Sequence, residues 1–171
     1  MKKTLFTVIA LIAFTLSASA ADNAANKTVS VQGKARIITP ITLSNNQALD
    51  FGVIARGTGN STIVVGAVET PTISVPTGDA VVLTSSAQTS AKFTVGGETS
   101  KSYNITIPST PQVISDGTNN LSITAFTCSN SLTNSVIGTN DVFYVGGTLT
   151  VPSTAVAASY TGTFSVTVAY N

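Results

Sequence analysis

The sequence predicts an all-β fold, and three observations carry this prediction. Apolar and polar residues alternate with a period of two in many short runs, which is the pattern of half-buried strands. These runs are rich in Val, Ile, Thr and aromatic residues, which favour the pleated surface of a sheet. Turn residues separate the runs at intervals of roughly 8–12 residues, a spacing typical of a sandwich or a barrel. We therefore expect one domain, an immunoglobulin-like β-sandwich.

The first twenty residues have the features of a secretory signal peptide. Two lysines precede the apolar run Leu5–Leu16, and the small residues at 18–20 form a cleavage site. This run is shorter than the roughly 20 residues of a transmembrane helix. We expect cleavage before Ala21, export through the inner membrane, and a location in the periplasm, at the cell surface or in an extracellular filament. We expect no transmembrane helix after the signal peptide is removed.

The predicted strands follow in order along the remaining chain. The first alternating run, Lys27–Ile37, places Val29, Val31 and Gly33 on one face. The later runs cover residues 61–68, 71–76, 80–86, 91–95, 102–108, 120–127, 142–151 and 160–171. Turn signals separate them at residues 57–60, 76–79, 96–97, 116–117 and 152–153. The last run, Tyr160–Asn171, alternates without a break.

Composition excludes several classes of function. Without the signal peptide the chain has 8 − 2 = 6 basic and 7 acidic residues, a net charge of −1, which does not fit a nucleic-acid binder. The sequence contains no His, so catalytic triads and histidine metal sites are excluded. Cys128 is the single cysteine and forms no intramolecular disulfide. The scattered carboxylates select no catalytic pair, so we expect no enzyme, no cofactor and no metal.

Four motifs in a fixed order carry a resemblance to a known family. They are DFGVI at 50–54, AKFTVGG at 91–97 with SYNITIP at 102–108, VGGTLTVP at 145–152, and the final YTGTFSVTVAYN. The set resembles a family of exported bacterial domains of unknown function, similar to the fimbrillin of the common pilus and to other pilin subunits. The resemblance implies an immunoglobulin-like subunit outside a Gram-negative cell, partnered by pilin-like subunits and a periplasmic chaperone. Two departures are the missing disulfide and Ala158, which stands where pilins commonly have Gly.

A mechanism of assembly consistent with this resemblance is β-strand addition. A sandwich that lacks one strand leaves an apolar groove and unpaired backbone groups beside its last strand. An extended segment of another subunit fills this gap, as in donor-strand complementation. Residues 21–34 are the candidate donor and residues 35–171 the sandwich. The opposing interpretation is that residues 27–37 are the first strand of a complete, self-paired sandwich.

Two faces are the candidate contacts of this assembly. The donor face consists of Val29, Val31 and Gly33. The acceptor-side strand consists of Phe164, Val166, Val168 and Tyr170. Because repeated insertion joins subunits head to tail, the contact builds an open filament.

The sequence thus predicts a non-enzymatic structural subunit of a bacterial surface filament, a fimbria or pilus. One alternative is a monomeric exported adhesin or glycan-binding β-sandwich. A second alternative is a small outer-membrane β-barrel, which alternating strands and few charges also fit. Polymers resistant to mild denaturant would distinguish a filament subunit from a monomeric binding protein.

Overall fold

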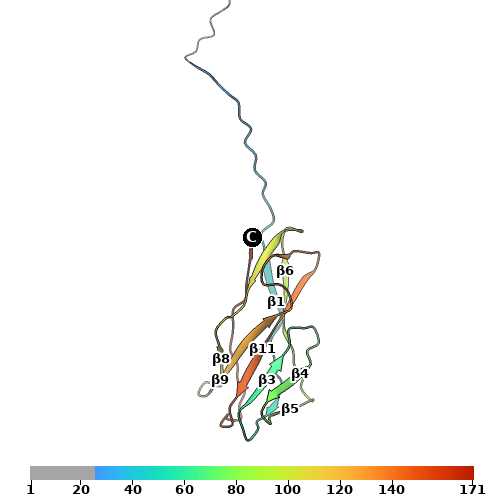
Figure 1. Ribbon diagram of the computed structural model, residues 1–171, viewed down its shortest axis with the longest axis vertical. Coiled ribbons are helices and arrows are strands. Elements are labelled where there is room, and N and C mark those ends of the chain that lie inside the picture. Colours follow the sequence, from blue (N-terminus) through green and yellow to red (C-terminus); the bar gives the residue numbers. More distant parts are fainter. Residues whose placement is uncertain (1–25) are drawn as a thin grey trace, which may run out of the picture. The chain divides into compact units, whose positions relative to one another are not determined.

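The computed structural model describes residues 26–171, which form strands, turns and loops (Figure 1). The strands are β1 (Thr42–Gln47), β2 (Ile54–Ala55), β3 (Ser61–Val65), β4 (Ile73–Thr77), β5 (Val81–Val82), β6 (Ala91–Gly96), β7 (Ser102–Thr106), β8 (Gln112–Ser115), β9 (Asn120–Cys128), β10 (Ser135–Val136), β11 (Asp141–Val151) and β12 (Thr167–Tyr170). No helix occurs among the described residues, so the prediction of an all-β fold is confirmed. Residues 37–171 form one compact unit, and residues 26–36 belong to another.

The strands form antiparallel sheets that pack together. The largest sheet has seven strands, with β1, β6, β11, β3 and β4 in one path and β8 joined through β9 to β11. A second sheet has the order β10-β7-β12, and β2 pairs with β5 in a short third sheet. Every recorded strand pair is antiparallel.

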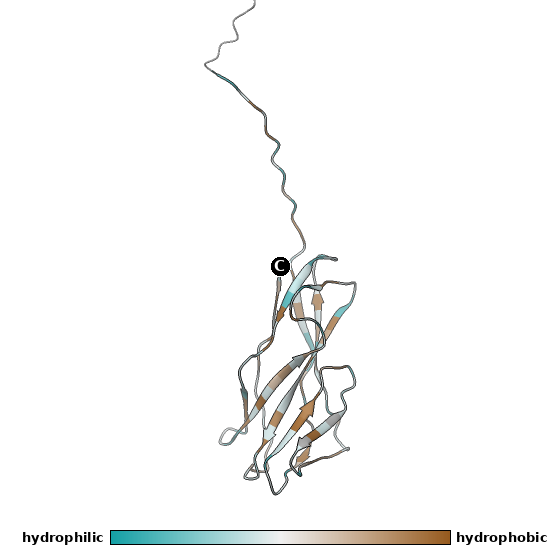
Figure 2. Ribbon diagram, in the orientation of Figure 1, coloured by the Kyte–Doolittle hydropathy of each residue, from teal (hydrophilic) through white to brown (hydrophobic). Residues whose placement is uncertain are grey.

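Strand β11 connects the two hydrophobic clusters of the core. Its first half pairs with β6 and contributes Phe143, which stacks on Phe93 with ring centroids 5.2 Å apart. Its second half pairs with β3 and contributes Leu149 to the other cluster, beside the fully buried Ile63. Figure 2 shows the apolar residues, in brown, recurring along these strands. Burying such side chains stabilises the fold by about 1.5–3 kcal/mol each.

Residues 26–41 form no strand, which corrects the prediction at Lys27–Ile37. The interpretation of residues 27–37 as a self-paired first strand is therefore wrong. Val29 and Val31 are 80% and 87% exposed, and no hydrogen-bonded neighbour strand is present. An alternating pattern shows that a segment could present one apolar face, but it does not show whether a neighbouring strand is there to form hydrogen bonds. A stable strand needs both. The predicted signal peptide and residues 21–25 lie outside the described residues.

In the last run, Tyr160–Asn171, the predicted alternation of side chains is confirmed, but only part of the run pairs with another strand. From Thr163 to Asn171 every second residue is exposed, and the residues between them are partly buried. A ladder forms only over Thr167–Tyr170, which pairs with β7. The side-chain period was thus predicted correctly, whereas the strand begins later than Tyr160.

Replacing Gly146 with Ala is expected to destabilise the fold. A Cβ at this buried position in β11 would collide with main-chain atoms of Val65, Gly66 and Ala67, which cannot move without disturbing β3. We expect a loss of about 1–3 kcal/mol, the usual cost of overpacking. The free energy of unfolding in urea measures it. Gly138→Ala is the matched control because a Cβ there meets nothing within 4 Å, and equal destabilisation of both variants would contradict the prediction.

Candidate binding groove

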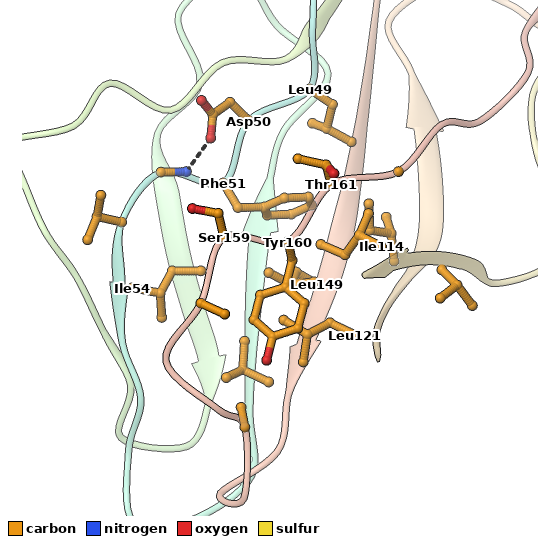
Figure 3. Close-up of a pocket in the computed structure, with 18 of the residues that line it drawn as sticks. Leu49, Asp50, Phe51, Ile54, Ile114, Leu121, Leu149, Ser159, Tyr160 and Thr161 are labelled. Carbon is orange, nitrogen blue, oxygen red and sulfur yellow. Dashed lines mark hydrogen bonds between the residues drawn. The ribbon is translucent and has the colours of Figure 1, made fainter. Parts of the chain in front are cut away.

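A groove of about 820 Å³ lies between two stretches that are far apart in the sequence (Figure 3). The first wall consists of residues 48–56, and the second wall consists of residues 155–164. Residues of β8, β9 and β11 complete its lining. The volume is within the range of sites that bind ligands or peptide segments.

The interior of the groove is apolar. Phe51 projects from the first wall, and Tyr160 lies on the second wall next to Leu121 and Leu149 (Figure 3). Phe51, Leu121 and Leu149 belong to the buried core, so the groove opens directly onto one hydrophobic cluster. Ligands that would fit this surface present apolar side chains rather than charges.

The rim of the groove exposes further apolar side chains. Val53, Val113 and Val156 all line it and are 53%, 55% and 50% exposed. Single exposed apolar residues are common, but three around one apolar groove indicate a contact surface.

The first wall is held from one side only. Asp50 and Thr89 exchange two backbone hydrogen bonds of 2.8 and 3.0 Å, and Ile54–Ala55 pairs with β5. The Asp50 carboxylate accepts a bond from the Gly52 N–H at 2.7 Å, which fixes the turn beside Phe51. The backbone of the first wall is therefore hydrogen-bonded along one side, to Thr89 and to β5.

The second wall has little main-chain support. Within residues 156–166, the structure pairs the backbone with another strand only at Thr161, which exchanges bonds of 2.8 and 3.0 Å with Ser115. Residues 157 and 158 form a bend, and the Val156 carbonyl accepts a bond from the Tyr160 hydroxyl at 2.8 Å. The backbone groups between residues 162 and 166 have no backbone partner among the described residues, and unpaired backbone beside apolar surface is open to pairing with a further strand.

Arg56 joins the two walls at one end, which we call the far end. Its Nη1 donates to the carbonyls of Ser153 and Ala155 at 3.1 and 2.7 Å. Beside it, the Asp79 carboxylate accepts bonds from Thr58 Oγ1, Thr58 N and Gly59 N at 2.7, 2.9 and 3.2 Å. These bonds, that from Thr58 Oγ1 first, lower the pKa of Asp79 to about 2.

Tyr170 forms hydrogen bonds at the opposite end of the unit, which we call the near end. Its hydroxyl donates to the Thr39 carbonyl at 2.8 Å and accepts from the Glu98 N–H at 2.7 Å. A Cβ at Gly97 would collide with this hydroxyl, so the glycine permits the contact. The first wall therefore runs from the near end to the far end, and the second wall returns in the opposite direction.

The two predicted contact faces belong to different units of the chain. Val29, Val31 and Gly33 lie in the segment without strands, and Phe164, Val166, Val168 and Tyr170 share a partly buried face. Of these seven residues only Phe164 lines the groove, where its ring lies 4.9 Å from that of Phe126. The other three acceptor-side residues pack on the second hydrophobic cluster, which contains Phe143.

Sequence reasoning missed the first wall and the role of Arg56. Phe51 belongs to a motif that carried the resemblance, but no function was assigned to it. The signal available was the alternation of Leu49 and Phe51 in a short run bounded by a glycine. Its meaning depends on the second wall, which is about a hundred positions away in the chain and which local patterns do not reveal.

Comparisons with known proteins give one match. The family model described as "Domain of unknown function (DUF4402)" matches residues 41–170, which include both walls. Neither the curated proteins nor the solved structures contain a match. Among residues 26–171 there is no helix long and apolar enough to cross a membrane.

Replacing Tyr170 with Phe tests the near-end contact. The ring stays in place, but the hydrogen bonds with Thr39 and Glu98 are lost, so we expect a loss of about 1–3 kcal/mol in unfolding free energy. Urea unfolding provides the measurement. A stability equal to that of the parent would show that the hydroxyl contributes nothing.

Replacing Asp79 with Asn tests the acid dependence of the far end. Because the folded-state pKa of about 2 lies below the ordinary value of 3.8, this carboxylate stabilises the fold above about pH 4 and loses its effect toward pH 2. We expect Asp79→Asn to lower the Tm at pH 7 and to flatten the fall of Tm between these pH values. Thr58→Val, which removes the strongest donor, should produce a smaller change in the same direction. An unchanged acid profile in both variants would contradict the assignment.

Proposed function

Because the chain belongs to this family of domains of unknown function, whose name assigns no activity, we propose a function from the groove: the protein is a non-enzymatic structural subunit of a bacterial surface filament. In this proposal the groove accepts a β-strand from another subunit. The single observation that supports it most is the second wall, where the backbone of residues 156–166 pairs with another strand only at Thr161, next to an apolar interior.

An unpaired, extended edge beside apolar surface is prone to pair with any available strand, and natural proteins protect such edges. Here Val156, at the start of the second wall, is half exposed, and no Lys, Asp, Glu or Pro occurs in residues 156–166. Since the usual protecting residues are missing from this stretch, a partner strand is its natural cover.

The fold enters the proposal as an incomplete immunoglobulin-like sandwich. The described sheets are antiparallel and packed together, and the groove lies between a wall from the first part of the domain and a wall from its last part. In this proposal one further strand lies between the two walls. An inserted strand would bury Val53, Val113 and Val156, which contributes about 25 cal/mol for each Å² of apolar surface removed from water.

Export is the second part of the proposal. The predicted signal peptide at residues 1–20 would direct the chain through the inner membrane, and assembly would follow in the periplasm or at the cell surface. With one cysteine, the chain has no intramolecular disulfide to strengthen a sandwich in that compartment. Insertion of a strand supplies stabilisation in its place.

A charge placed in the groove should prevent assembly. Ala158 is exposed and lines the second wall, so Ala158→Glu brings a carboxylate into an apolar contact. With the full chain expressed in a Gram-negative host, we expect sheared surface filaments, counted by electron microscopy, to fall by about tenfold or more, since burying an unpaired charge costs several kcal/mol. Ser109→Glu is the matched control because Ser109 is exposed and outside the groove lining.

Three outcomes have distinct meanings for the proposed function. Loss of filaments in Ala158→Glu alone supports the groove as the assembly site. Filaments of normal yield in both variants would exclude the groove from assembly. If the parent protein forms only monomers, the proposal of a filament subunit fails, and glycan-binding assays on the same groove variants test the alternative of an exported binding protein.

A further inference from the structure

We propose that residues 156–160 form a flap that partly closes the groove of a free subunit, and that the side chain of Tyr160 holds this flap in place. In this inference an incoming strand opens the flap by displacing the Tyr160 ring. The inference rests on the proposed function and adds a regulatory step to it: a contact within the subunit opposes assembly until a partner strand is present.

Both ends of the flap are anchored, but its middle is not. At one end Arg56 Nη1 donates to the Ala155 carbonyl at 2.7 Å. At the other end Thr161 exchanges two backbone hydrogen bonds with Ser115. Between these anchors the backbone of residues 156–160 pairs with no strand in the part of the chain that the structure describes. Opening of the flap therefore breaks no strand pairing.

One side chain holds the middle of the flap. Residues 157 and 158 form a bend, and the Tyr160 hydroxyl reaches back across it to donate to the Val156 carbonyl at 2.8 Å. The side chains of residues 156–159 are all exposed, so Tyr160 is the one flap residue that is partly buried. A segment with so few buried contacts opens locally at a small cost in free energy.

The Tyr160 ring contacts the surface that a partner strand would need. It packs on the hydrophobic cluster that forms the interior of the groove. Figure 3 shows the ring beside Leu121 and Leu149, which both line the groove. Apolar side chains of a partner would gain free energy by burial on this same surface. The ring and the partner therefore compete for one place.

The hydrogen bond of Tyr160 also affects the backbone of the second wall. It occupies the Val156 carbonyl, and the bend at residues 157 and 158 departs from the extended form that a ladder requires. The backbone between residues 162 and 166 carries no such bend and has no backbone partner among residues 26–171. We therefore expect a strand to pair with residues 162–166 first. Displacing Tyr160 then frees the Val156 carbonyl and lets the flap straighten.

The flap weakens binding without preventing it. If a ligand binds only the open form, its apparent Kd equals the intrinsic Kd divided by the open fraction. Removing one hydrogen bond of ordinary strength from the closed form raises the ratio of open to closed molecules by about fivefold. Loss of the Tyr160 hydroxyl should therefore increase the affinity of the groove for an apolar ligand by the same factor.

Replacing Tyr160 with Phe in the full chain tests this inference. The ring stays but the bond to Val156 is lost, so the apolar dye anilinonaphthalene sulfonate should bind the monomer about fivefold more tightly than it binds the parent. A fluorescence titration measures the affinity. Tyr160→Ala, which also removes the ring, should bind the dye at least as tightly as Tyr160→Phe. Tyr144→Phe is the matched control because it loses the same hydroxyl outside the groove lining, and it should bind the dye as the parent does. Cooperative unfolding in urea shows that each variant is folded.

The time at which filaments form separates this inference from the proposed function. After induction in a Gram-negative host, Tyr160→Phe should form filaments earlier than the parent, because the contact that opposes assembly is weaker. Dye binding that is unchanged in Tyr160→Phe, or raised equally in Tyr144→Phe, would overturn the inference. Filaments of Tyr160→Phe that form no earlier than those of the parent would overturn it as well. These results leave a filament-forming parent in place, whereas a parent without filaments overturns the proposed function and with it the regulatory step.

Discussion

Pairing of β11 with three neighbours is the interaction on which the other parts of the domain depend. On one edge it binds β6 over its first half and β3 over its second half, and β9 covers the other edge. Because one strand carries Phe143 into one hydrophobic cluster and Leu149 into the other, the two clusters are fixed to each other through a continuous main chain. Gly146, at the change of partners, lets β3 approach closely.

The groove is a consequence of this arrangement. β9 and β11 supply its apolar floor through Leu121, Ile123, Leu149 and Val151. The first wall is fixed to β5 and Thr89, and the second wall touches β8 only at Thr161. Arg56 joins the two walls at the far end through the carbonyls of Ser153 and Ala155, and at the near end of the unit Tyr170 bonds Thr39 and Glu98.

The sequence predicted what depends on side-chain periodicity and missed what depends on pairing. Alternation at the end of the chain identified the partly buried face that includes Phe164 and Val168, because period two is a local property. The same reasoning predicted a strand around Val29 and Val31, where no neighbour supplies hydrogen bonds. Phe51 was found within a motif but not within a wall, since its groove forms only when residues distant in the chain meet.

The near-end contact of Tyr170 has a mechanical consequence for a fibre built as we propose. A pull on the chain at Thr39 would pass in part through the hydroxyl of Tyr170 to β12. At the groove the pull would run along the inserted strand, whose hydrogen bonds lie across it. Such bonds are loaded together in shear rather than opened one after another. The joint between subunits would then resist force through the whole length of the inserted strand at once.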